Sequence, residues 1–190
     1  MKFNILVLIL ILFSSCEKKN EEKIKEQEAT IEKKFIPKLG KAFFDFDEID
    51  YYSINISEDE AMDLFDNENK SNLEKLKFDV LLGETPNNMK DISFINKLEK
   101  IGFEKHKIEP TKYDEIKNIF TEKTVSESYT SACVAIYRDF LVFRKNKKII
   151  GMAKICFGCR QFRIAGTNSN AENFGQDGDF EKLEFILRNL

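Results

Sequence analysis

The sequence has no tryptophan, three prolines, eight glycines and a single histidine. Its glycines are scattered, so it lacks the glycine-rich phosphate loop of nucleotide-binding proteins. One histidine excludes the HExxH motif of metalloproteases, and the GxSxG motif of α/β-hydrolases is also absent. No short motif therefore assigns an enzymatic activity, and we expect no cofactor.

A large excess of one charge is also missing. Thirty basic residues are mixed with 33 acidic residues, which gives a formal net charge of −3. This balance lacks the basic patch of nucleic-acid-binding domains, so we expect no nucleic-acid partner. Apolar residues make up 42% of the chain, which argues against a disordered protein.

The sequence has one long hydrophobic run, the nine residues Ile5 to Phe13, which follow the basic residue Lys2. As a helix this run would extend roughly 14 Å, whereas a bilayer core of about 30 Å requires about 20 residues. The run is too short to cross a membrane and matches the hydrophobic part of a secretory signal peptide. We predict that residues 1–15 are a signal peptide.

Ser14, Ser15 and Cys16 follow directly, before a charged segment. This order resembles the lipobox of bacterial lipoproteins, including those of flavobacterial type, although Phe13 stands where leucine is more usual. The resemblance implies that Cys16 is acylated and becomes the first residue of the mature chain. It also implies attachment to the lipid bilayer of the cell envelope, at the periplasmic face or the outer surface. An ordinary secretory signal with an incidental cysteine is the alternative.

Residues 16–39 are predicted to comprise the lipidated cysteine and a charged tether. The segment Glu17 to Lys34 is dense in lysine and glutamate and has two isoleucines as its only large apolar residues. Such a segment cannot bury a core, so we expect a solvated spacer; a docking helix is the alternative. Pro37 and Gly40 then precede a single folded domain, residues 40–190.

The first half of this domain has the pattern of strands alternating with helices. Tyr51–Ile56 alternates apolar and polar residues, as a half-buried strand does. Ser57 and Glu60 form a capping-box sequence, which predicts the start of a helix. Four further elements are expected: a strand at Phe78–Leu82, a helical segment with Phe94, Leu98 and Ile101 that ends at Gly102, a strand at Phe103–Ile108, and a helix from Pro110 to Phe120.

The second half has the pattern of a β-meander followed by a helix. Cys133–Arg144 and Ile149–Phe157 are rich in β-branched and aromatic residues and flank a short polar turn, which predicts a hairpin. Gln161–Ala165 is the expected third strand. A final helix, with Asp179 as its N-cap, has four apolar residues on one face: Phe180, Leu183, Leu187 and Leu190. We predict an α+β domain with helices packed on one antiparallel or mixed sheet.

Three cysteines other than Cys16 are present: Cys133, Cys156 and Cys159. In an exported protein disulfides persist, and an odd number leaves at least one thiol free, bound to a ligand or paired between chains. Three hypotheses stay open. One is a structural disulfide with a buried free thiol, the second is a redox-active CxxC pair at Cys156 and Cys159, and the third is a zinc site with His106 as fourth ligand.

The register of the predicted hairpin determines which cysteines meet. A three-residue loop, Lys145–Lys147, would place Cys133 opposite Cys159. A two-residue loop, Asn146-Lys147, would place Cys133 opposite Arg160, still adjacent to Cys159. Opposed Cα atoms lie about 4.5–5.5 Å apart, within the disulfide range of about 4.4–6.8 Å. A local bulge would instead bring Cys156 into reach. We predict that the Cα atom of Cys133 lies within about 8 Å of that of Cys156 or Cys159, and that one thiol stays free.

His106 is the one side chain with the ordinary pKa of a general base at neutral pH. No serine or cysteine beside it in the sequence forms a nucleophilic dyad, so we expect an exposed or hydrogen-bonded histidine. A loose calcium-loop spacing also occurs in the chain, but it lacks the glycine and the closing glutamate of that loop. Its residues are Asn168, Asn170, Glu172 and Asp179.

The stretch from Cys133 to Cys159 contains Tyr137-Arg138-Asp139, Phe143, Gly151 and the sequence ICFGC at its end. This pattern resembles an uncharacterised group of exported bacterial proteins with a cysteine, an arginine-led strand, a hairpin and an ICFxC strand end. The resemblance implies that the three cysteines form a unit, and it implies no activity.

We therefore expect a membrane-anchored envelope lipoprotein whose domain binds an unknown protein or small ligand and has no catalytic residues. The alternative is a thiol–disulfide or metal-dependent enzyme that uses the cluster of Cys133, Cys156 and Cys159.

Overall fold

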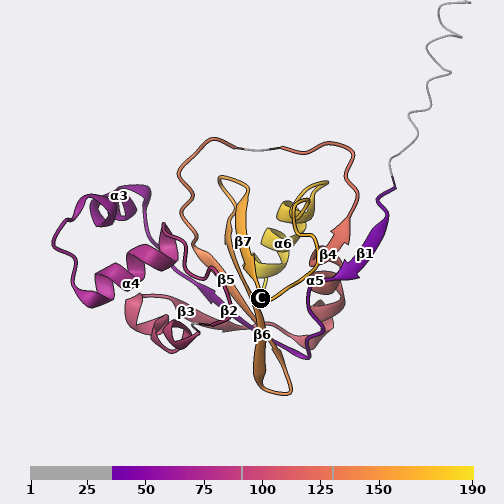
Figure 1. Cartoon of the computed structure of the whole chain (residues 1–190), viewed down its shortest axis with the longest axis horizontal. Coiled ribbons are helices and arrows are strands. Elements are labelled where there is room, and N and C mark those ends of the chain that lie inside the picture. The colour runs from indigo at the N-terminus through magenta and orange to yellow at the C-terminus, as the bar shows by residue number, and fades with distance from the viewer. Residues whose placement is uncertain (1–35, 91, 130) are drawn as a thin grey trace, which may run out of the picture. The chain divides into compact units, whose positions relative to one another are not determined.

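Five strands form the central antiparallel sheet: β2 (Glu48–Ser53), β3 (Glu104–Lys107), β5 (Asp139–Lys145), β6 (Lys148–Cys156) and β7 (Gln161–Ala165). They adjoin in the order β3-β2-β5-β6-β7 (Figure 1). A separate two-stranded sheet pairs β1 (Leu39–Ala42) with β4 (Thr121–Lys123). The computed structural model describes residues 36–90, 92–129 and 131–190. The antiparallel sheet with its helices is the predicted α+β class.

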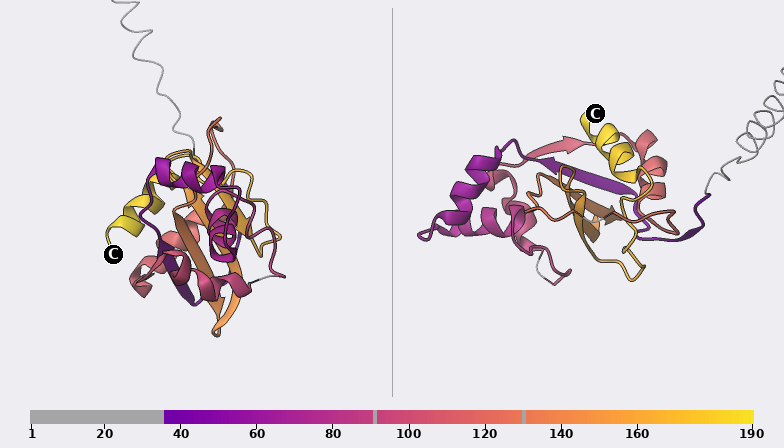
Figure 2. Two further views of the ribbon diagram at one scale, coloured as in Figure 1. Left: turned by 90° about the vertical axis from the view of Figure 1, so that its left-hand side faces the viewer. Right: turned by 90° about the horizontal axis from the view of Figure 1, so that it is seen from above.

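Helices cover both faces of the central sheet. The α-helices are α3 (Glu58–Asp66), α4 (Asn72–Leu81), α5 (Tyr113–Ile119) and α6 (Asp179–Arg188). Three 3₁₀ segments accompany them: η1 (Ser93–Lys97), η2 (Glu99–Ile101) and η3 (Pro110–Lys112). Figures 1 and 2 show α3 and α4 on one side of the sheet and α5 and α6 on the other.

Alternation along the strands explains the two layers. Successive side chains of a strand point to opposite faces, so Leu141 and Phe143 pack against α5 and α6, whereas Phe140 and Val142 pack on the side of α3 and α4. All four are fully buried. A strand buried on both faces shows a continuous apolar run, which is the pattern that residues 140–143 have.

The layer formed by α5 and α6 is rich in phenylalanine. The ring of Phe44 stacks on that of Phe143 with 4.6 Å between centroids, and it lies directly over Gly151, the cross-strand partner of Phe143. A side chain at position 151 would collide with this ring. Gly151 is therefore required for the close approach of Phe44 to the sheet.

Several predicted local signals are confirmed. The Ser57–Glu60 capping box has both of its hydrogen bonds, from Glu60 N–H to Ser57 Oγ at 3.1 Å and from Ser57 N–H to Glu60 Oε2 at 2.8 Å. The segment around Phe94 is helical as expected, in the 3₁₀ form. Gly102 ends η2 in the left-handed conformation, with φ of 101°. The hairpin turn is Asn146-Lys147, and both residues have positive φ, as a tight two-residue turn requires.

Other predictions are wrong. Phe78–Leu82 is not a strand: its first four residues form the last turn of α4, and Leu82 is the C-cap of that helix. Asp179 is the first residue of α6, and Gly178 is the N-cap. Leu190, expected on the apolar face of this helix, lies beyond its end and is about half exposed.

The folded unit comprises Pro37–Leu190 and thus begins three residues before the expected boundary at residue 40. The predicted signal peptide, Cys16 and residues 17–35 of the predicted tether lie outside the described residues. Within the described ranges, no helix has the length and apolar character needed to cross a membrane.

Candidate functional site

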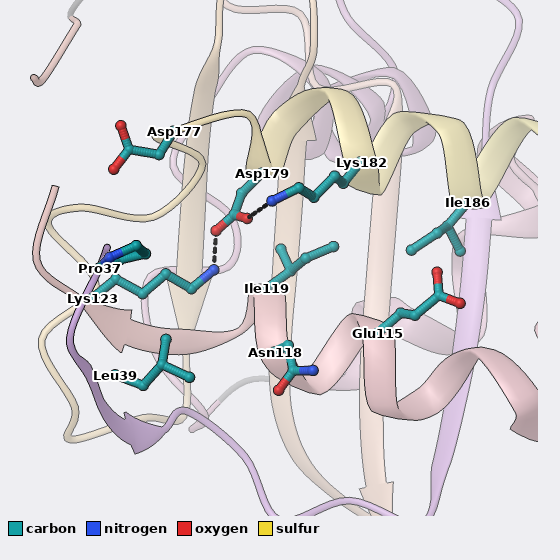
Figure 3. Close-up of a pocket in the computed structure, with 10 residues that line it drawn as sticks. All are labelled: Pro37, Leu39, Glu115, Asn118, Ile119, Lys123, Asp177, Asp179, Lys182 and Ile186. Carbon is teal, nitrogen blue, oxygen red and sulfur yellow. Dashed lines mark hydrogen bonds and ion pairs between the residues drawn. The ribbon is translucent and has the colours of Figure 1, made fainter. Parts of the chain in front are cut away.

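A cavity of about 440 Å³ lies between α5, α6 and the β1–β4 pair (Figure 3). Its apolar wall is formed by Leu39, Ile119 and Ile186. Ile119 and Ile186 belong to the buried core, whereas Leu39 is 60% exposed at the opening. The volume is within the range of about 300–1,000 Å³ that is usual for small-ligand sites.

A buried carboxylate forms the polar side of this cavity. Asp179 is 4% exposed and accepts hydrogen bonds from Lys123 Nζ and from Lys182 Nζ, the latter at 3.4 Å. In Figure 3 both ammonium groups point toward this carboxylate. The position of Asp179 in the first turn of α6 also suits a negative charge. The pairing offsets the cost of burying the carboxylate.

Exposed polar groups surround the opening. Asn118 and Glu115 project from α5, and Asp177 lies on the loop before α6. The Asp177 carboxylate accepts a hydrogen bond from Ser126 Oγ at 2.8 Å, which ties that loop to the segment after β4. The Lys182 side chain is 65% exposed and keeps donors available to a ligand. An apolar floor beside charged groups of both signs, one of them an accessible ammonium group, suits an amphipathic molecule.

The sequence did not indicate this cavity. Its walls come from β1, α5, β4 and α6, which are far apart in the chain. Asp179 belongs to the loose calcium-loop spacing of the sequence, but its carboxylate is engaged by two lysines. Asn170 Oδ1 accepts a hydrogen bond from Glu172 N–H at 2.8 Å. In the described part of the chain, no group of three or more His, Cys, Asp or Glu residues is placed to hold a metal ion.

Cys133 and Cys159 form a disulfide, with 6.0 Å between their Cα atoms. Cys156 is a buried free thiol. This confirms the prediction of proximity and of one free thiol, and it is the arrangement of the first hypothesis. All three cysteines also line one cavity of about 370 Å³ on the side of α3.

The route to this pairing differs from the expected one. A bulge in β6 shifts the register between Phe143 and Arg144, and β5 begins only at Asp139, so Cys133 lies in the extended segment before the strand. Cys159 lies in the four-residue turn between β6 and β7. The disulfide thus joins a loop to a turn rather than two strands.

His106 does not lie with the cysteines. It is on β3, opposite Tyr51, whose ring belongs to the core beneath α6. Three strand spacings separate β3 from β6, which amounts to about 14 Å, whereas zinc–ligand bonds are about 2.0–2.3 Å. Cys156 also faces the other side of the sheet, with Lys154. The structure therefore does not bring together the four ligands of the zinc hypothesis.

Instead, His106 contacts a serine that the sequence did not associate with it. Its Nε2 atom lies 2.7 Å from Ser53 Oγ on the neighbouring strand β2. Asp139, which is paired with Ser53 across β2 and β5, is engaged by Tyr51 and Arg188. Among the described residues, the serine and histidine thus form a pair without the third, orienting group of a catalytic triad.

Lys154 is a further polar residue that the sequence did not indicate. It has no exposed surface, and its Nζ atom donates to Val80 O at 3.0 Å and to Gly83 O at 2.7 Å, at the C-terminal end of α4. The ammonium group lies 4.4 Å from the centre of the Tyr137 ring. Burial, with a smaller contribution from Arg163, lowers the pKa of Lys154 to about 7.

Comparisons with protein-family models, with curated proteins and with solved structures yielded no significant match to this chain.

Proposed function

We propose that this chain is a membrane-anchored lipoprotein of the bacterial cell envelope whose domain binds a small amphipathic ligand in the cavity between α5 and α6. The observation that carries the binding function is the 440 Å³ cavity with its apolar wall and its Lys123–Asp179–Lys182 group. The apolar part of the ligand would contact Ile119 and Ile186. Its anionic end would contact the exposed ammonium group of Lys182.

The anchoring function rests on the sequence alone. A short apolar run, two serines and Cys16 occur in the order of a lipobox, and an acidic and basic segment follows. One acyl chain binds a bilayer only marginally, whereas two or more chains anchor a protein stably. Acylation of Cys16 would thus hold the domain at a membrane.

Metabolic labelling with radioactive palmitate tests the anchor. We expect the wild-type chain to incorporate label and to sediment with membranes, and Cys16→Ser to do neither. Equal labelling of both proteins, or a mature N-terminus at another residue, would contradict the anchoring proposal.

A fluorescent anionic amphiphile, 8-anilinonaphthalene-1-sulfonate, tests the cavity. Asn118 is exposed and lines the opening, so Asn118→Trp should obstruct the cavity without disturbing the core. We expect this variant to weaken binding of the dye at least about tenfold, equivalent to about 1.4 kcal/mol.

The matched control is Lys117→Trp. Lys117 is exposed on the same helix and is not part of the cavity wall, so its substitution should leave the dissociation constant unchanged. If both variants bind the dye as the wild type does, the cavity is not the binding site.

A further inference from the structure

Three sulfur atoms border one space on the α3 side of the sheet. The Cys133–Cys159 disulfide and the free thiol of Cys156 line the same cavity of about 370 Å³. Cys156 is the last residue of β6 and pairs with Gln161 of β7, so the turn between them returns to the same place. Cys159 lies within that turn. The chain therefore holds Cys156 and Cys159 near each other independently of the disulfide.

The disulfide is accessible, whereas the thiol is shielded. Cys133 is exposed and Cys159 is partly exposed, but Cys156 is 4% exposed. Gly158, at the tip of the turn, faces open space, because a side chain placed there would meet no atom within 4 Å. Because both disulfide cysteines have exposed surface, a second molecule can approach the disulfide from solvent.

We propose that the three cysteines form a thiol–disulfide exchange site, in which Cys156 rearranges the disulfide and a reactive Cys133 thiol is presented to a disulfide of another molecule. This site is separate from the proposed ligand cavity and does not depend on it. Its occupant is defined by its chemistry as a molecule that carries a disulfide.

The first step is an internal exchange. The Cys156 thiol gives its proton to water, and the resulting thiolate attacks Cys159 Sγ. The bond between Cys133 and Cys159 breaks as the bond between Cys156 and Cys159 forms. Cys133 leaves as a thiolate and takes up a proton from water. One disulfide and one thiol are present before and after, so the step needs no oxidant or reductant.

The surroundings favour Cys133 as the leaving sulfur. Exchange is faster when the leaving thiolate is stabilised. The Ser131 hydroxyl lies 3.4 Å from Cys133 Sγ and is the only possible donor of this pair while the sulfur is in a disulfide. Arg138 lines the same cavity, as does Glu58, and Arg138 Nε donates to Ile56 O at 2.8 Å. A cation held in this space favours a thiolate.

Gln161 keeps the Cys133 segment in place when the disulfide is open. Its side-chain amide donates to Ser131 O at 3.0 Å and to Cys133 O at 3.1 Å. These contacts involve the backbone and do not require the disulfide. The exchange is therefore reversible, because the released sulfur stays beside the cavity.

In the second step the Cys133 thiolate attacks one sulfur of an external disulfide. A mixed disulfide forms between Cys133 and that sulfur, and the other sulfur of the external molecule leaves as a thiolate. Electrons balance, since one disulfide is consumed and one is formed.

Labelling of the folded chain with the aromatic disulfide 5,5′-dithiobis(2-nitrobenzoate) tests the proposal. Cys16→Ser serves as the background, so that Cys16 adds no thiol. We expect the native protein to release about one equivalent of thionitrobenzoate, as one exchangeable thiol requires. Peptide mapping should then find the label on Cys133 and a new Cys156–Cys159 disulfide. A label on Cys156, or no release before denaturation, would overturn the proposal.

A second variant tests the geometry without the probe reaction. In Cys133→Ser only Cys156 and Cys159 remain in the domain, and we expect them to oxidise to a disulfide that leaves no titratable thiol in denaturant. Two titratable thiols in a folded variant, verified by circular dichroism, would show that these sulfurs do not exchange. Cys156→Ser is the matched control, because it should keep the Cys133–Cys159 disulfide and release no thionitrobenzoate.

Discussion

The two faces of the central sheet are stabilised by different interactions. The face beneath α5 and α6 is packed with aromatic rings, and its buried carboxylate, Asp139, is paired with Arg188 and with the Tyr51 hydroxyl at 2.6 Å. The face beneath α3 and α4 has a mainly aliphatic core and a buried cation, Lys154, whose partners are backbone carbonyls. Its buried carboxylate, Asp50 of β2, is paired with Lys105 and Arg144. The strands β2, β5 and β6 each contribute side chains to both faces.

This difference shows what makes a buried charge tolerable. A carboxylate is accommodated where side-chain cations and hydroxyls converge, whereas an ammonium group is accommodated at a helix C-terminus, where free carbonyls and the helix dipole favour positive charge. Lys154 also caps α4 from outside the helix. The last turn of α4 contains no basic residue of its own, so Lys154 of the sheet supplies the positive charge at this end of the helix.

The largest effect should come from the aromatic face. Phe143 is fully buried and contacts the rings of Phe44 and Phe120, with centroids 4.6 and 4.8 Å away. Phe143→Ala should lower the free energy of unfolding by about 3–5 kcal/mol, measured by urea denaturation. The control is Phe65→Ala, at a position that is 56% exposed on α3, and it should cost less than about 1 kcal/mol. Similar losses for both would refute this description of the aromatic layer.

The buried lysine should give an effect that depends on pH and is smaller than that of Phe143→Ala over any single pH unit. Because burial lowers the pKa of Lys154 from 10.5 to about 7, the unfolded chain binds more protons than the folded chain between these values. The stability of the wild type relative to Lys154→Met should therefore rise with pH across this window, by at most about 1.4 kcal/mol per pH unit. Below about pH 7 both states are protonated and the difference should be constant.

Urea denaturation at several pH values measures this dependence. Lys148→Met is the control, because Lys148 lies on the same strand and is exposed; its difference from the wild type should not vary in that window. A flat profile for Lys154→Met would mean that the folded chain keeps this lysine protonated as the unfolded chain does.

The smallest effect should come from the start of α4. Ser71 accepts a hydrogen bond from Glu74 N–H, and Ser71 N–H donates to Glu74 Oε2 at 2.8 Å. Ser71→Ala should lower the free energy of unfolding by about 1 kcal/mol, and Ser71→Asp should restore most of it. Thermal unfolding monitored by circular dichroism can measure both, and an unaffected alanine variant would mean that the packing of α4 alone determines its stability.

The sequence predicted elements whose signals are local. The capping box at Ser57 and the turn at Asn146-Lys147 depend on residues within a few positions of each other. The same capping-box signal occurs at Ser71 and Glu74, and it would have identified α4. The apolar run at Phe78–Leu82 concealed it, because a short apolar run looks the same in a buried strand and in a buried helix.

Elements that depend on distant partners could not be predicted. β1 and β4 are short strands that form because they pair with each other, although about half of the domain separates them in the chain. The ligand cavity has the same origin, since its walls meet only after folding. The cysteine pairing was predictable because the β5–β6 hairpin brings the chain segments of Cys133 and Cys159 together. A bulge in β6 nevertheless changes the register that the length of the hairpin loop predicts.

The edge strand β3 bears on how copies of this domain behave at high local density. Three of its four residues are charged: Glu104, Lys105 and Lys107. Molecules confined to a surface, as the proposed anchor would confine them, meet one another often, and an open strand edge invites edge-to-edge aggregation. Charges along β3 oppose such pairing. Replacing these charged residues with apolar ones would make β3 an edge prone to aggregation.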